Sequence, residues 1–96
     1  MAAYMIFIRE GEVFDPVEMA AYNRLNRENA GAHKLTPLVI YGDMETLEGD
    51  APDGIVILAF ANAEEAKSWY HSPQYQAAAV HRRKAANYRA IIVEGI

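Results

Sequence analysis

A serine, a tyrosine and an arginine are spaced so that together they could bind one small ligand. Tyr75 and Arg82 are seven residues apart, so in a helix they lie on one face, two turns apart. Ser72 stands at the expected start of the same helix. The arginine fork suits a carboxylate or a phenolic oxygen, and the tyrosine adds a hydrogen bond. The alternative is that Ser72 only caps the helix, Tyr75 packs in the core and Arg82 lies in water.

Other aromatic side chains are candidates for the wall of such a pocket. Trp69, with Tyr70 beside it, could form a flat aromatic surface. Tyr22 and Tyr41 could meet in a cleft between a helix and a sheet. Aromatic residues with a polar tip are also common in protein cores, where the tip finds a hydrogen-bond partner. Core packing is therefore the alternative for all of them.

Imidazole groups suited to acid–base chemistry near neutral pH occur only at His33, His71 and His81. His33 is the best candidate, although placement at the surface would explain it as well. Together with Tyr75 and Arg82 it completes the set of catalytic candidates, for which no reaction can be assigned. No histidine is spaced with another metal ligand on an expected helix, and neither a phosphate loop nor a nucleophile elbow is present, so we expect no metal and no cofactor.

Composition restricts the class of protein. The 96 residues suffice for one domain, and the net charge of -4 offers no basic field for nucleic acid. No apolar run approaches the roughly 20 residues that a membrane-spanning helix needs. Cysteine is absent, which excludes thiol catalysis, and the first residues lack the pattern of a signal peptide. We expect a single cytoplasmic domain, residues 1–96, that binds neither nucleic acid nor membrane.

Strand and helix patterns alternate along the first half of the chain. Residues 4–8 are apolar β-formers and predict a strand. Asp15 and Pro16 suit the start of a helix, with Glu18 completing a capping box and Gly31 ending the helix. Residues 36–48 predict a second strand, in which Gly42 indicates a bulge or a close backbone approach.

The second half of the chain repeats this order. A hairpin loop over residues 49–54 leads to an apolar strand over residues 55–60. Asn62 caps a short helix that ends at Ser72, and Pro73 opens a further helix to about Ala86. Residues 90–94 form the last strand. The order β-α-β-β-α-β is that of a ferredoxin-like α+β fold, with one four-stranded antiparallel sheet and all helices on one face.

The strands lack the alternation expected of a sheet with one face in water. Residues 4–8, 55–60 and 91–93 present apolar side chains to both faces, while the helices can cover only one. An exposed apolar face of this size invites association, and the same face of a second copy is the simplest cover. We therefore predict a homodimer.

Three segments resemble the family of domain of unknown function 1330. They are Glu48-Gly49-Asp50, the run from Trp69 to Tyr75 that is followed by Arg82, and Val93-Glu94-Gly95. The resemblance implies a ferredoxin-like protomer that pairs sheet to sheet in a dimeric α/β barrel. Superfamily members include cofactor-free monooxygenases, haem-degrading enzymes and lactone isomerases, whose pockets lie between helices and sheet. The chain departs from the family pattern at Tyr41, where an arginine is common, and at Asp43, where a glycine is common.

Two functions remain open at this point. The first is a dimer that binds or transforms a small aromatic or carboxylate molecule in a helix–sheet cleft, which requires a cavity of at least roughly 300 Å³ that touches Arg82 or a histidine. The second is a non-catalytic dimeric module for structure or interaction, which predicts a filled core.

Overall fold

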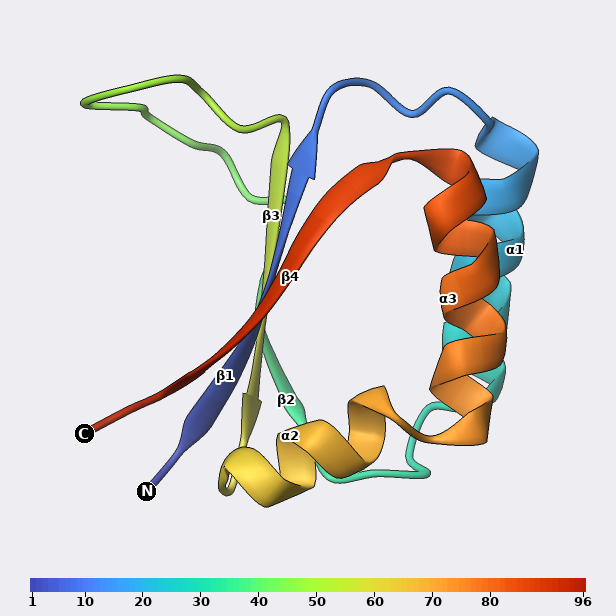
Figure 1. The fold of residues 1–96 in the computed structure, drawn as a ribbon, viewed down its shortest axis with the longest axis vertical. Coiled ribbons are helices and arrows are strands. Elements are labelled where there is room, and N and C mark those ends of the chain that lie inside the picture. Colours follow the sequence, from blue (N-terminus) through green and yellow to red (C-terminus); the bar gives the residue numbers. More distant parts are fainter.

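The computed structural model describes residues 1–96, and it has the predicted ferredoxin-like order of elements (Figure 1). The elements are β1 (Ala3–Glu10), α1 (Pro16–Glu28), β2 (Thr36–Ile40), β3 (Gly54–Phe60), α2 (Ala63–Tyr70), α3 (Pro73–Ala85) and β4 (Asn87–Glu94). The four strands form one antiparallel sheet in the order β2-β3-β1-β4. None of the helices is long and apolar enough to cross a membrane.

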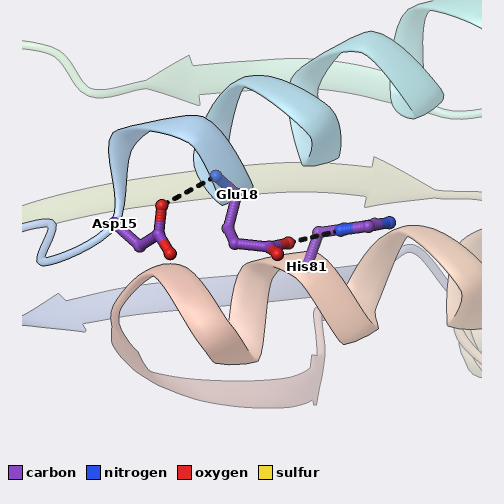
Figure 2. Close-up of polar contacts among 3 residues, drawn as sticks. All are labelled: Asp15, Glu18 and His81. Carbon is purple, nitrogen blue, oxygen red and sulfur yellow. Dashed lines mark hydrogen bonds and ion pairs between the residues drawn. The ribbon is translucent and has the colours of Figure 1, made fainter.

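The predicted helix caps are present, with one exception. The Asp15 side chain accepts a hydrogen bond from the Glu18 amide at 3.1 Å, and Pro16 begins α1. The expected capping box is wrong, because the Glu18 carboxylate does not return to the cap. It contacts Nδ1 of His81 on α3 at 2.5 Å instead, so it links the two long helices (Figure 2).

The break between α2 and α3 follows the sequence closely. Asn62 accepts from the Glu65 amide at 2.9 Å and caps α2. Ser72 accepts from the Tyr75 amide at 3.2 Å and caps α3, with Pro73 in its first turn. Both caps satisfy amides that a helix start leaves free. The corner is therefore fixed by local hydrogen bonds, which determines how Tyr75 enters the molecule.

The second strand is shorter than predicted. It ends at Ile40, and residues 41–53 form an exposed irregular arm. Tyr41 adopts a left-handed backbone conformation with φ of 51°, which turns the chain out of the sheet. The bulge lies at Leu38, between Pro37 and Val39, rather than at Gly42.

The close approach expected at Gly42 is found at Gly54. A Cβ atom at Gly54 would lie 2.7 Å from Cδ1 of the Tyr41 ring, so only glycine leaves room for that ring in its present position.

The two faces of the sheet differ as predicted. One face carries Met5, Phe7, Leu58 and Phe60, which are buried and form the core with the helices. All three helices lie on this side (Figure 1). We call the opposite side the open face; its apolar residues are Tyr4, Ile6, Ile8, Val39, Ile55, Ile57, Ala59, Ile91 and Val93, and Arg89 lies beside Ile8 near one end of it. No element of the chain covers the open face, and its β4 residues Ile91 and Val93 are 43% and 45% exposed.

Candidate functional site

A large cleft lies between the helices and the sheet. Its volume is about 1240 Å³, well above the roughly 300 Å³ at which pockets for small molecules begin. Side chains from both long helices, from α2 and from β1, β2 and β3 contribute to its wall. The wall includes seven of the residues proposed from the sequence: Tyr22, His33, Tyr41, Trp69, Ser72, Tyr75 and Arg82. That these residues bind a ligand remains a prediction. Tyr70, His71 and His81, which were also considered, do not line the cleft.

Arg82 is the most unusual group in the cleft. It is only 5% exposed, which rules out the alternative in which it lies in water. The guanidinium carbon lies 5.3 Å from the centre of the Phe7 ring and 5.4 Å from that of Tyr88. It has no ion pair with a carboxylate, and its Nε atom has no hydrogen-bond partner. A buried cation without an anion is unfavourable, so the site favours a negatively charged ligand.

The charge on Arg82 is retained despite its burial. Burial lowers the pKa of the guanidinium, but attraction to the ionised oxygens of Tyr75 and Tyr22 and a hydrogen bond with Tyr75 outweigh this, and the net pKa is raised. Since that attraction requires ionised phenols, it is absent at neutral pH, where both phenols keep their protons. Arginine is nevertheless a fixed positive charge at this position.

Tyr75 and Tyr22 form a hydrogen-bonded pair next to this charge. Their hydroxyl oxygens are 2.9 Å apart, which joins α3 to α1. Burial raises the pKa of both phenols, so both keep their protons at neutral pH. One proton is used between the two oxygens, and the other polar side chains beside them, Asn26 at Tyr22 and Arg82 at Tyr75, act as donors to the pair. The pair therefore has a spare donor for a ligand oxygen.

Replacing Tyr75 by Phe is expected to destabilise the protein by about 1 kcal/mol, because the hydrogen bond between the Tyr75 and Tyr22 hydroxyls is lost. Urea denaturation measures this difference. Tyr70→Phe is the matched control, since the Tyr70 ring lies 5.5 Å from that of Tyr75 but its hydroxyl makes no hydrogen bond. Equal stability of the two variants would contradict the proposed role of the pair.

Trp69 provides a flat apolar surface in the cleft. Its ring centre is 4.1 Å from that of Tyr75, and it also contacts Phe7 and Phe60 at 6.2 and 5.6 Å. These contacts are the core packing that the sequence left as an alternative. The same ring lines the cleft, so it can also contact a planar ligand.

The three remaining candidates occupy different parts of the wall. The Ser72 hydroxyl donates to the Trp69 carbonyl at 2.7 Å and caps α3, so its proton is already engaged. His33 is half-buried in the segment between α1 and β2. The Tyr41 hydroxyl lies 2.5 Å from that of Tyr88, and burial raises the pKa of Tyr41.

Tyr88 and Phe7 were missed from the sequence. Tyr88 would have been found by starting the last strand at Asn87, because Tyr88, Ala90 and Ile92 then share the inner face.

The site has no grouping of acidic, histidine or cysteine side chains that could hold a metal ion, and none occurs elsewhere in the structure. The polar groups of the cleft are therefore one guanidinium and several neutral hydroxyls and amides around an apolar wall. This chemistry suits recognition of an organic anion.

The family model described as domain of unknown function (DUF1330) matches residues 2–96. No curated protein matches the chain in sequence. Three solved structures illustrate the similarity in fold. A protein of unknown function from Rhodopseudomonas palustris has a TM-score of 0.67 at 16% identity, covering 99% of this chain and 82% of that one.

The second is a dimeric ferredoxin-like protein of unknown function from Thermobifida fusca. It has a TM-score of 0.62 at 12% identity, covering 97% of this chain and 90% of that one. The third is SnoaB, a cofactor-independent oxygenase from Streptomyces nogalater, with a TM-score of 0.55 at 13% identity, covering 99% and 91% of the two chains. At these identities the similarity shows a shared fold.

Proposed function

The chain belongs to the family of domain of unknown function DUF1330, and from that premise we propose that it binds a small aromatic anion in the cleft between its helices and its sheet. The anionic group, a carboxylate or a phenolate, would lie against Arg82. The spare proton of the Tyr22–Tyr75 pair would donate to the same group, and the ring would lie along Trp69.

The observation that carries the proposal is the unpaired guanidinium of Arg82. Desolvation of a charged group costs several kcal/mol, and charge-assisted hydrogen bonds to a ligand would recover part of it. A cation without a protein counterion beside a cavity of about 1240 Å³ therefore supports a site for an anion.

The alternative is a dimeric module without a ligand. Such a module needs neither a large cavity nor a buried unpaired charge, because a filled apolar core is more stable than either. Both features weigh against the alternative.

Cofactor-free chemistry on the bound molecule is a second candidate. SnoaB, which has the same fold, is a cofactor-independent oxygenase. In this chain, Arg82 and the spare phenol proton could stabilise the oxygen of an enolate or a phenolate as it forms. His33 is the only imidazole on the cleft wall and is the candidate base.

We further propose that the chain is a homodimer joined through its open face. The arm of residues 41–53 and both termini extend on that side of the sheet, away from the helices (Figure 1). The arm carries the exposed apolar side chains of Met44 and Leu47. A second copy would cover both the sheet and these side chains, and the T. fusca neighbour is dimeric.

A comparison of benzoate with benzamide tests the proposed ligand class. The two molecules have nearly the same shape, but only benzoate is negatively charged at pH 7. Calorimetric titration is expected to show at least about tenfold tighter binding of benzoate, because only the anion pairs with the buried charge. Equal affinities, or binding of neither molecule, would refute an aromatic-anion site.

A further inference from the structure

A second, smaller pocket lies on the other side of Arg82. Its volume is about 440 Å³, and it is lined by residues from the end of α2, the end of α3 and the start of β4. The lining residues are Tyr70, Arg82, Arg83, Ala86, Asn87, Tyr88 and Ala90. Polar groups dominate this wall, in contrast to the aromatic cleft, and we call it the β4 pocket.

Arg82 and Tyr88 are the only residues that line both cavities. Residues of β2 line only the large cleft, Asn87 and Ala90 of β4 line only the β4 pocket, and β2 and β4 are the two opposite edges of the sheet. Arg82 thus borders both cavities, and its guanidinium lies close to the ring of Tyr88, the other residue that they share. A guanidinium has five N–H donors in one plane, so it can donate toward both sides. Its Nε atom has no partner in the protein.

Arg83 adds a second positive charge to the β4 pocket, and it is held in place. Its Nη2 atom donates to Oε1 of Gln76 at 3.2 Å, and Nε2 of Gln76 donates to the Tyr70 carbonyl at 2.7 Å. This chain of hydrogen bonds ties the arginine to the wall at the end of α2. No aspartate or glutamate lines the pocket, so neither charge is neutralised there.

Cations near a helix C-terminus often serve only to offset the negative end of the helix. Here two of the four terminal carbonyls already have partners: Ala85 accepts from the amides of Phe14 and Asp15, and Arg82 accepts from Ala86. Offsetting the helix end also does not explain why Arg82 is buried beside two cavities. A ligand explains both arginines.

We propose that the β4 pocket is an oxyanion site, which takes one carboxylate or phosphate group between Arg82 and Arg83. Asn87 and the Tyr70 hydroxyl, which makes no hydrogen bond in the protein, are further donors on its wall. The oxyanion is either a free ion or the acidic end of a larger ligand. The site shares Arg82 with the large cleft, but Arg83 lines only the β4 pocket, so a change at Arg83 tests this pocket separately from the cleft.

Titration of inorganic phosphate, followed by backbone amide NMR at constant ionic strength, tests the proposal. The amides of Ala86 and Asn87 are expected to shift and saturate. Arg83→Gln is expected to raise the dissociation constant at least about fivefold, because it removes a charged donor from the pocket. Lys84→Gln is the matched control: it removes the same charge from the same helix end, but Lys84 lines neither cavity, and we expect a change below about twofold.

Equal effects of Arg83→Gln and Lys84→Gln would overturn the proposal, as would shifts confined to the large cleft. Phenyl phosphate separates the two sources of the oxyanion. If the group belongs to a larger ligand that reaches past Arg82, phenyl phosphate binds more tightly than phosphate and shifts amides in both cavities. If the oxyanion is a free ion, phenyl phosphate gains nothing. If the wild-type protein binds phosphate but not benzoate, the function proposed for the large cleft is refuted and the oxyanion site in the β4 pocket is not.

Discussion

Replacing Arg82 by Met is expected to stabilise the ligand-free protein by about 1–2 kcal/mol and to abolish measurable binding of benzoate. Methionine has a similar length and no charge, so the desolvation penalty of the buried cation, several kcal/mol, is removed. The variant loses two cation–π contacts worth about 1–2 kcal/mol each and the hydrogen bond with Tyr75, but sulfur–aromatic contacts with Phe7 and Tyr88 replace part of them. The free energy of unfolding is therefore expected to be higher for the Arg82→Met variant than for the wild-type protein.

The loss of benzoate binding follows from the same charge. Removing one partner of a buried ion pair typically costs 2–5 kcal/mol, which is roughly 30-fold or more in affinity. Denaturation measures the stability of the ligand-free variant, and calorimetric titration of the same preparation measures its affinity for benzoate. Arg24→Met on α1 is the control, because Arg24 is exposed and forms only an ion pair with Glu28, so neither quantity should change. An Arg82→Met protein that is less stable yet still binds benzoate would contradict the assignment.

The fold could be predicted from the sequence for two reasons. The helix caps depend on a few neighbouring residues, and the open face depends only on whether both faces of the strands are apolar. Asp15, Asn62 and Ser72 each carry a cap that requires only three or four residues of context. The strands are apolar on both faces, but the right-handed crossovers place all helices on one face of the sheet. The sequence therefore predicted that the other face is left open. The family resemblance, based on the segment from Trp69 to Tyr75 and on two short motifs, is confirmed by the match over residues 2–96.

Long-range contacts account for what was wrong. Glu18 has two possible partners, its own helix start and His81, and only the packing of α1 against α3 decides between them. The extent of β2 depends on the Tyr41 ring fitting over Gly54, two residues that are thirteen positions apart. Neither contact leaves a periodic signal in the sequence.

The sequence could predict which residues line the cleft, but not the environment of Arg82 within it. Spacing put Tyr75 and Arg82 on one helix face, and both line the cleft. The sequence could not reveal that Arg82 is buried without a counterion, because an arginine near a helix end is usually exposed. It also could not indicate that Arg82 borders two cavities, since β2 and β4 become opposite edges only in the folded sheet.

Replacing Ile57 by Glu is expected to raise the dissociation constant of the homodimer at least about a thousandfold. Ile57 pairs with Ile6 and Val39, in a row of apolar side chains that extends across the open face to Ile91. In a symmetric dimer each substitution occurs twice, so two carboxylates lose water without a partner. At about 2–3 kcal/mol for each, the combined cost is at least 4 kcal/mol, and each 1.4 kcal/mol is a factor of ten. Sedimentation equilibrium at micromolar concentration measures the shift toward the 10.7 kDa monomer.

Val17→Glu is the control for this change, because Val17 is 79% exposed on α1 and should leave the dimer intact. The wild-type protein should sediment at twice 10.7 kDa, and a wild-type monomer would refute the open-face dimer. The substitution also separates assembly from binding. Ile57 points away from Met5, Leu58 and the cleft, so a folded Ile57→Glu monomer should retain its affinity for benzoate. If affinity were lost with the partner while the fold persisted, the cleft would depend on contacts across the open face, and each protomer would not be a complete binding unit.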